Sequence, residues 1–302
     1  MNSYKVESIT FFVSRVLRRL PINKKSKIKF NQERHERIEK KLMPIFQSSL
    51  KKVKNNKEIF SDSNNGPIWI FWWQGERKMP RIVYQCYKSL LKNKGNRQVI
   101  LITQKNYYKY TDISSNIIDL VNQGNITLTH FSDILRFNLL KNNGGLWLDS
   151  TIFVNKPISD KYFQSIFTCS GYPDKDYFFV TKGKWCGFLF GGAKENIIFK
   201  FMDEFFKEYW EKNDKLIDYF LIDYALNFAW ENDLSGFQEF TQKNFGKYNP
   251  NLFALEPLLN KKYKNSVWAQ KVKDTEMYKL TYKVKLSDNE NTYYNKIVNL
   301  GD

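Results

Sequence analysis

An acidic residue and an arginine that share one helix face are the first feature of this sequence that could do chemistry. Asp133 and Arg136 lie three residues apart in a stretch, residues 131–141, that predicts a helix. A carboxylate beside a guanidinium can bind the hydroxyl groups of a polyol while the guanidinium faces a phosphate group. The alternative is an ordinary ion pair on a helix surface, and these two residues alone favour that alternative.

A second candidate group follows a tight turn. Gly144 and Gly145 allow the chain to reverse, and the apolar run at residues 146–148 predicts a strand that ends at Asp149. A carboxylate at the end of a strand beside a cleft can hold a divalent cation on a diphosphate. An aspartate that only terminates a strand in a turn is the common alternative. The close succession of the helix pair, the glycine turn and Asp149 is more specific than any of the three alone.

Three further side chains could contribute to the same chemistry. Asp223 lies in an aromatic helical stretch, where an acid could face a cleft and bind sugar hydroxyls, or occupy a polar helix position near a loop. Lys279 and Lys283 could neutralise a leaving diphosphate, or they could be two of many solvated lysines.

The elements that would position these residues alternate between strands and helices. Strands are predicted at residues 68–72, 99–102, 146–148 and 184–190, with a short extended piece at 126–128. Helices are predicted at residues 81–91, 113–121, 131–141, 195–210 and 216–230. This alternation predicts an α/β fold with a mostly parallel sheet between helices. Ligands of such sheets bind at the carboxyl ends of the strands.

The first 66 residues have a different pattern. Apolar residues at helical spacing predict a helix over residues 6–20 that carries Arg15, Arg18 and Arg19, and a charged helix over residues 33–57 follows. A basic amphipathic helix can bind an anionic membrane surface, or it can pack on its own domain or on a partner. The turn-rich segment at residues 61–67 predicts a boundary between a basic helical extension, residues 1–66, and an α/β domain, residues 67–302.

The composition limits the classes of protein to consider. The 302 residues are 42% hydrophobic and 17% aromatic, enough for a packed core. Their net charge of +17 suits an anionic partner, or it reflects a lysine-rich proteome. Three cysteines and two histidines without metal-like spacing argue against a disulfide scaffold and a zinc site, and fit a reducing cytosol. No apolar run of about 18 residues and no secretory signal is found. The expected location is therefore cytoplasmic, as a peripheral protein on the inner face of the cell membrane if the basic helix binds lipid.

Most of the chain resembles a known family. The segments HFSDILR at residues 130–136 and GGLWLDST at residues 144–151 are similar to the nucleotide-sugar core of the capsular polysaccharide synthesis glycosyltransferases. These enzymes are relatives of the Och-type mannosyltransferases and of the glucosyltransferase domain of large clostridial toxins. The resemblance extends from about residue 67 to residue 283, through segments at residues 68–69, 73–75, 79–80, 219–224 and 279–283. It implies a GT-A fold, which is a Rossmann-like sheet with helices on both faces.

The resemblance also implies roles for individual residues. Trp69 would stack on the nucleobase of the donor, while Asp133 and Arg136 would hold its sugar and its phosphate side. Asp149 would be the first acid of the family's Asp-x-Asp metal motif, in which Thr151 replaces the second acid. The expected cofactor is a divalent cation, Mn²⁺ or Mg²⁺, held by Asp149 and Thr151 and bound mostly through the phosphates of the donor.

The expected reaction is transfer of a hexosyl unit from a nucleoside-diphosphate sugar to a carbohydrate or lipid-linked oligosaccharide acceptor, and the resemblance implies retention of the anomeric configuration. Asp149 and Asp223 are the expected catalytic residues.

Two other interpretations remain open. A non-catalytic basic protein that binds membranes or nucleic acid would explain the net charge, although not the arrangement of Asp133, Arg136 and Asp149, and we expect no nucleic-acid partner. A degenerate transferase that binds a donor without turnover would explain Thr151.

Overall fold

A five-stranded sheet forms the centre of the computed structural model, which describes residues 3–54, 64–287 and 289–300. The strands lie in the order β2 (Val99–Ile102), β1 (Ile68–Phe71), β3 (Gly145–Leu148), β6 (Leu189–Gly192) and β5 (Ile166–Thr168). β1 pairs in parallel with β2 and β3, whereas β6 runs antiparallel to its neighbours β3 and β5. Four of the five strands therefore run in one direction, which confirms the expected mostly parallel sheet.

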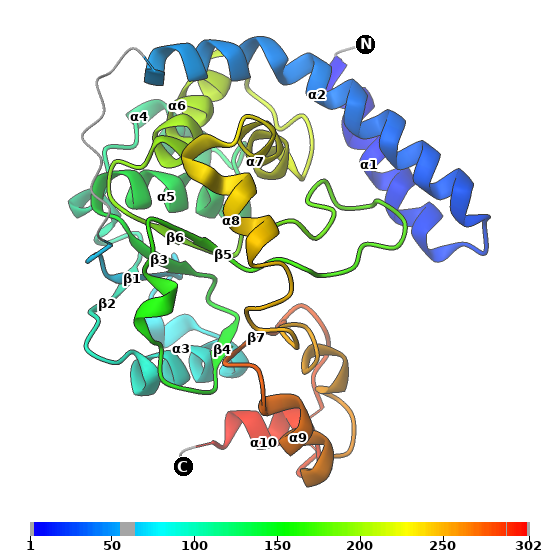
Figure 1. The fold of residues 1–302 in the computed structure, drawn as a ribbon, viewed down its shortest axis with the longest axis vertical. Coiled ribbons are helices and arrows are strands. Elements are labelled where there is room, and N and C mark those ends of the chain that lie inside the picture. The colour runs from blue at the N-terminus through cyan, green and yellow to red at the C-terminus, as the bar shows by residue number, and fades with distance from the viewer. Residues whose placement is uncertain (1–2, 55–63, 288, 301–302) are drawn as a thin grey trace.

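Helices cover both faces of this sheet (Figure 1). α5 (Leu128–Asn143) and α6 (Ile197–Lys212) pack against each other on one face, and α3 (Arg81–Asn93) lies on the other. Further helices are α4 (Ser115–Asn122), α7 (Leu221–Glu231), α8 (Phe237–Lys243), α9 (Asn265–Val272) and α10 (Tyr293–Val298). Because both faces are covered, every side chain of β1 and β3 is buried, and these strands read as apolar runs without alternation. The expected α/β class is confirmed.

The turn between α5 and β3 needs its glycines. Gly144 and Gly145 have φ angles of 65° and 105°, in the left-handed region that other residues rarely adopt. A Cβ on Gly145 would also lie 2.1 Å from the carbonyl oxygen of Pro67, in the segment that leads into β1. Only glycine allows β3 to approach this segment so closely, and β3 then delivers Asp149 to the end of the strand.

α5 begins earlier than its apolar spacing predicts. The hydroxyl of Thr127 accepts a hydrogen bond from the backbone N–H of His130 (3.2 Å) and caps the helix. The prediction of an extended piece at residues 126–128 was wrong at both ends, because Ile126 lies in a bend and Leu128 is the first residue of the helix.

Two later elements are shorter than predicted. The segment at residues 184–190 is a turn until β6 begins at Leu189, whose N–H donates to the carbonyl of Cys186 (3.2 Å). The helix predicted at residues 216–230 begins at Leu221, because Asp218 accepts a hydrogen bond from the N–H of Phe220 and holds the preceding residues in a turn (2.8 Å).

The amino-terminal extension folds back as a helical hairpin. α1 (Ser3–Arg19) and α2 (Lys24–Lys54) pack together, and α2 lies across α6 (Figure 1). Phe46 of α2 stacks on Phe228 of α7 with ring centroids 5.0 Å apart, and Arg34 forms a buried ion pair with Asp218. α2 therefore shares a core with the α/β domain. Parts of the predicted boundary segment and of the predicted charged helix, residues 61–63 and 55–57, lie outside the described residues.

Candidate functional site

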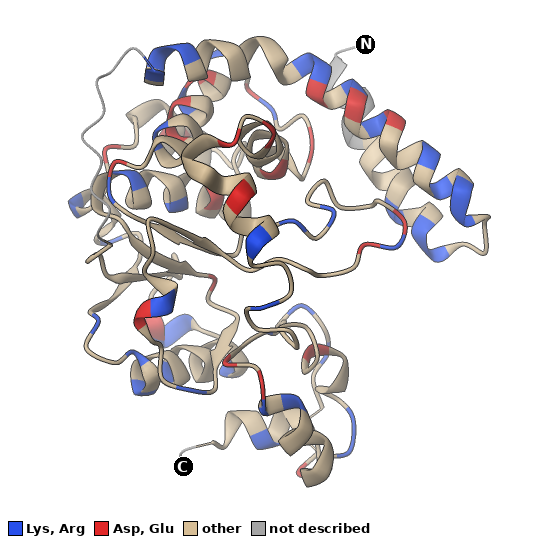
Figure 2. Ribbon diagram, in the orientation of Figure 1, with Lys and Arg blue, Asp and Glu red and all other residues tan. Residues whose placement is uncertain are grey.

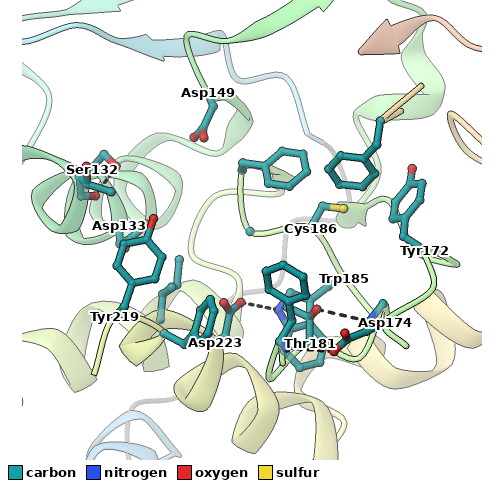
Figure 3. A pocket seen from close by; sticks show the side chains of 18 of the residues that line it. Ser132, Asp133, Asp149, Tyr172, Asp174, Thr181, Trp185, Cys186, Tyr219 and Asp223 are labelled. Atoms are coloured by element: carbon teal, nitrogen blue, oxygen red, sulfur yellow. Dashed lines mark hydrogen bonds between the residues drawn. The ribbon is translucent and has the colours of Figure 1, made fainter. Parts of the chain in front are cut away.

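Two adjoining cavities open beside the end of β3. The aspartate cavity, of about 780 Å³, is lined by Asp133, Arg136, Asp149 and Asp223, among others. The lysine cavity, of about 820 Å³, is lined by Asp149, Thr151, Lys279 and Lys283 together with aromatic side chains. Figure 3 shows Asp149 above the aspartate cavity, with Asp133 and Asp223 at different sides of it. Asp149 lines both cavities and therefore marks their junction.

Arg136 joins the two predicted donor-binding acids. Its Nη2 lies 3.3 Å from Oδ1 of Asp133 and 3.2 Å from Oδ1 of Asp149. Only 4% of the Arg136 side chain is exposed, and its guanidinium lies 5.1 Å from the ring centre of Trp147. Arg136 is therefore buried in the cavity wall, and only 14% of the Asp133 side chain is exposed, so the two do not form an ordinary ion pair on a helix surface.

Three side chains that donate hydrogen bonds or carry positive charge contact the carboxylate of Asp149. Nζ of Lys279 lies 3.0 Å from Oδ2, while Nε1 of Trp147 donates to Oδ1 (3.0 Å) and Arg136 contacts the same oxygen. Burial raises the pKa of Asp149, but the charges of Lys279 and Arg136 outweigh burial, so the net effect lowers the pKa. Asp149 is therefore a carboxylate at neutral pH.

The small second sheet brings Lys279 to this place. β4 (Ile152–Val154) pairs antiparallel with β7 (Met277–Lys279), and the register sets Lys279 opposite Ile152. Because β4 begins three residues after Asp149, the ammonium of Lys279 reaches that carboxylate and also donates to the hydroxyl of Thr151.

The two predicted metal ligands do not fit a divalent cation well. Asp149 offers one carboxylate and Thr151 a neutral hydroxyl, and the ammonium of Lys279 lies between them. Within the described ranges, no group of three or more His, Cys, Asp or Glu residues could hold a metal ion. Mg²⁺ and Mn²⁺ prefer several oxygen ligands, so this donor set favours a cationic side chain over a metal.

Asp223 faces the aspartate cavity from α7. Its Oδ1 accepts a hydrogen bond from Nε1 of Trp185 (3.0 Å), which Figure 3 shows as a dashed line. A Cβ added to Gly187 would lie 3.4 Å from Nη1 of Arg136 and 3.9 Å from Oδ1 of Asp223. The absence of a side chain at Gly187 therefore leaves room between Arg136 and Asp223. Burial raises the pKa of Asp223 to about 7, so this group can donate or accept a hydrogen bond near neutral pH.

Asp223→Asn should stabilise the fold at high pH while reducing transfer. The folded pKa of Asp223 lies above that of an unfolded aspartate, so the free energy of unfolding falls as the pH rises from about 4 to about 7. An asparagine keeps the acceptor for Trp185 and removes that penalty. Melting curves should coincide for variant and wild type at pH 4, whereas at pH 8 the variant should melt at a higher temperature than wild type.

Asp119→Asn, on the exposed side of α4, is the control and should not change the pH dependence. A variant that is no more stable than wild type at pH 8 would show that burial does not raise the pKa of Asp223.

The structure does not bring Trp69 to either cavity. Only 1% of this residue is exposed, and its indole Nε1 donates to the carbonyl of Gly144 (2.8 Å). Its ring packs edge-on against Tyr110. The expectation that Trp69 stacks on a nucleobase is corrected, because a ring buried in the core has no free face for a base. Its position instead supports the glycine turn before β3.

Sequence reasoning missed two residues of the site. Nε1 of Trp147 donates a hydrogen bond to Asp149. Trp147 lies two residues before Asp149, and this spacing, which places two side chains on the same side of an extended chain, was the available signal. Tyr219 lines both cavities and is 49% exposed, but it precedes α7 in a turn whose direction no periodicity indicates. Lys283 is exposed and lines the lysine cavity, and its contact with a diphosphate stays a prediction.

The chain as a whole matches a known family. Residues 18–297 match the family described as capsular polysaccharide synthesis protein. The chain belongs to this family. The match begins within the amino-terminal extension, although the resemblance of individual motifs began only at about residue 67. It supports a role in polysaccharide synthesis, as the sequence motifs indicated.

No curated protein and no solved structure matches the chain. None of the helices in the described parts of the chain is both long and apolar enough to cross a membrane.

Proposed function

We propose that the protein is a glycosyltransferase that moves a hexosyl unit from a nucleoside-diphosphate sugar to a carbohydrate hydroxyl during capsular or surface polysaccharide synthesis. The observation that carries this proposal is Arg136, which is buried between Asp133 and Asp149 in the wall of a large cavity. The membership of the capsular polysaccharide synthesis family supports it. The relationship to the Och-type and toxin enzymes, and the retention of the anomeric configuration, are proposed on the motif resemblance.

The two cavities suit the two halves of such a donor. The hexosyl unit would lie in the aspartate cavity, where Asp133 and Asp223 can bind its hydroxyl groups. The diphosphate would lie in the lysine cavity, where Lys279 and Lys283 offer positive charge. The anomeric carbon would then lie near Asp149, at the junction of the cavities. An aromatic platform for the base is available in the lysine cavity, where Trp72, not Trp69, lines the wall.

Catalysis in this arrangement would rest on the leaving group. The bond between the anomeric carbon and the diphosphate oxygen breaks, and a bond from the acceptor oxygen to that carbon forms. The nucleoside diphosphate leaves with the electron pair of the broken bond, and the hydroxyl proton of the acceptor passes to a phosphate oxygen of that leaving group. Cations fixed beside the developing charge stabilise the transition state more than the ground state. Lys279 is held in place by Asp149 and Thr151, so we propose that it supplies the charge that a divalent cation supplies at a site with two acids.

We also propose that the protein is located at the membrane surface. α1 carries Arg18 and Arg19 in its last turn, and the exposed residues Lys24 and Lys25 follow at the start of α2. These charges support binding to an anionic membrane surface on the cytoplasmic side.

A panel of nucleotide sugars, screened by thermal shift, tests the proposal against its two rivals. A donor at about 100 times its dissociation constant should stabilise the fold by roughly 2.7 kcal/mol. Stabilisation together with release of nucleoside diphosphate is the expected result. Stabilisation without release, in the presence of acceptors, would indicate a degenerate transferase. A chain that no nucleotide sugar stabilises would be a basic binding protein, and the proposal would be abandoned.

A further inference from the structure

A buried histidine lies beside Asp133 in the wall of the aspartate cavity. His130 is in the first turn of α5, three residues before Asp133, and only 4% of its side chain is exposed. Its Nδ1 lies 3.7 Å from Oδ2 of Asp133, which is too long for a hydrogen bond. Among the described residues, this nitrogen has no hydrogen-bond partner. A buried polar atom without a partner is costly and rare, so its place in a cavity wall indicates a functional role.

Trp210 of α6 determines which nitrogen of His130 carries the proton. Its indole Nε1 lies 3.1 Å from Nε2 of His130, and both side chains are buried. An indole nitrogen can only donate a hydrogen bond, so Nε2 has to accept it. A neutral imidazole has one N–H, which must then be at Nδ1. The atom without a partner is therefore a hydrogen-bond donor, and the carboxylate of Asp133 is the acceptor beside it.

Packing between α5 and α6 holds the imidazole in place. Its ring centre lies 5.4 Å from that of Trp210 and 5.6 Å from that of Phe206, which contacts it edge-on. Phe206 and Trp210 are four residues apart and lie on the same face of α6. The side chain of Asp133 is less confined, because 14% of it is exposed. A small rotation of Asp133 is therefore enough to bring its Oδ2 within hydrogen-bond distance of Nδ1.

Arg136 alone does not fix the carboxylate of Asp133. Nη2 of Arg136 lies 3.3 Å from Oδ1 of Asp133, but the same nitrogen also lies 3.2 Å from Oδ1 of Asp149. One nitrogen that is shared between two carboxylates leaves either of them room to turn. A second hydrogen bond, from His130 to Oδ2, would hold Asp133 from both of its oxygens.

We propose that His130 is a positioning residue for the donor sugar. When a nucleotide sugar binds, Nδ1–H of His130 donates to Oδ2 of Asp133 and holds that carboxylate against the hydroxyl groups of the hexosyl unit. The inference rests on the proposed function, because it takes the aspartate cavity as the place of the hexosyl unit. It adds a chain of hydrogen bonds from Trp210 through His130 to Asp133, which links the core to the sugar. The diphosphate, in the lysine cavity, does not depend on this chain.

His35 provides an internal reference for the position of the proton. It lies on α2 between acidic and basic residues, which Figure 2 shows along this helix, but its own side chain is buried. Burial lowers the pKa of His35 to about 4, so the imidazole is neutral at pH 8. Its Nε2 lies 3.1 Å from the carbonyl oxygen of Tyr177, and its Nδ1 lies 2.7 Å from the hydroxyl of Tyr224. A carbonyl only accepts, so the proton of His35 is on Nε2. The two histidines of the chain therefore carry their protons on opposite nitrogens.

NMR of the chain labelled with nitrogen-15 histidine tests the position of the proton without any ligand. At pH 8 one histidine should be protonated at Nδ1 and the other at Nε2, and the signals of the first should be absent from His130→Asn. The nucleotide sugar that the thermal-shift panel identifies should move the Nδ1 proton of His130 downfield and slow its exchange with water, because the hydrogen bond to Asp133 forms. The nucleoside diphosphate alone should leave this proton unchanged. A proton on Nε2 of His130, or an Nδ1 proton that the nucleotide sugar does not affect, would overturn the proposal.

Two substitutions separate a positioning role from support of the fold. His130→Leu removes the donor and should weaken the affinity for the nucleotide sugar by about ten-fold, while the affinity for the nucleoside diphosphate stays at the wild-type value. His130→Asn keeps an N–H near the place of Nδ1 and should recover most of the lost affinity. Phe206→Leu changes the same packing but no polar atom, so this control should bind both ligands as wild type does. A His130→Leu variant that loses affinity for both ligands equally, or a His130→Asn variant that binds no better, would show that His130 only supports the fold.

Failure of this inference and failure of the proposed function give different results. A wild-type chain that binds no nucleotide sugar would contradict the proposed function, whereas the position of the proton is measured on the free protein. A wild-type chain that binds the donor with unchanged His130 signals would contradict only the role of His130. The change in the Nδ1 proton is measured on wild type, so it decides this role even if His130→Leu does not fold.

Discussion

Arg136→Lys should lower kcat/KM for sugar transfer by about 10²- to 10³-fold, although it conserves the charge. Nη2 of Arg136 reaches Asp133 and Asp149 at 3.3 and 3.2 Å, while the planar guanidinium lies 5.1 Å from the ring centre of Trp147. A lysine ammonium on a shorter stem falls short of both carboxylates and has no planar group to stack on that ring. Asp133 would then lose the contact that orients it toward the donor, and Asp149 would keep only Lys279 as a cation. The loss should appear in donor affinity and in turnover together.

Arg97→Lys is the matched control for this change. Arg97 also joins an aspartate and an aromatic ring, since it lies 2.9 Å from Asp160 and 3.9 Å from the ring centre of Phe163. It lines neither the aspartate cavity nor the lysine cavity. Transfer by this control should stay close to wild type. A folded Arg136→Lys variant with wild-type turnover would mean that the buried arginine only supports the fold.

Lys279→Ala should lower turnover by a similar factor of about 10²–10³, and Mn²⁺ should restore part of the loss. Removing the ammonium frees one oxygen of Asp149 and the hydroxyl of Thr151, which are the two groups expected from the sequence resemblance to hold a cation. Wild type should keep its activity in a chelator, because Lys279 already supplies the charge. Lys285→Ala, at an exposed lysine that lines neither the aspartate nor the lysine cavity, is the control and should behave as wild type under both conditions.

The opposite result would indicate that a metal ion, and not Lys279, neutralises the leaving group. Wild-type activity that disappears in chelator and reappears with Mn²⁺ would contradict the role of Lys279. A Lys279→Ala variant with full activity in chelator would contradict that role as well, and would mean that other cationic side chains stabilise the leaving group.

Local patterns carried enough information to place much of the site. The Asp133–Arg136 spacing, the Gly144–Gly145 turn and the strand end at Asp149 are all contained in about 20 consecutive residues, where helical and strand geometry can be applied directly. The structure brings these residues together in one cavity wall. The same reasoning failed for Trp69, because strands buried on both faces show no alternation that tells an inward side chain from one near a ligand.

Long-range pairing explains most of what the sequence could not show. Lys279 reaches Asp149 through the β4–β7 register, across a separation of 130 residues that no local pattern encodes. The packing of the extension is similar. The apolar residues of α2, such as Leu42 and Phe46, are few among many charges, and only the presence of α6 and α7 shows that they belong to the main core.

Release of nucleoside diphosphate from nucleotide sugars by the purified chain tests the proposed transfer most directly. We expect that wild type consumes at least one nucleotide sugar of a panel, that a carbohydrate acceptor accelerates the release, and that Arg136→Lys suppresses it while Arg97→Lys does not. A folded wild-type chain that neither binds nor consumes any nucleotide sugar of the panel, with or without divalent cations and acceptors, would show that it is not a nucleotide-sugar transferase.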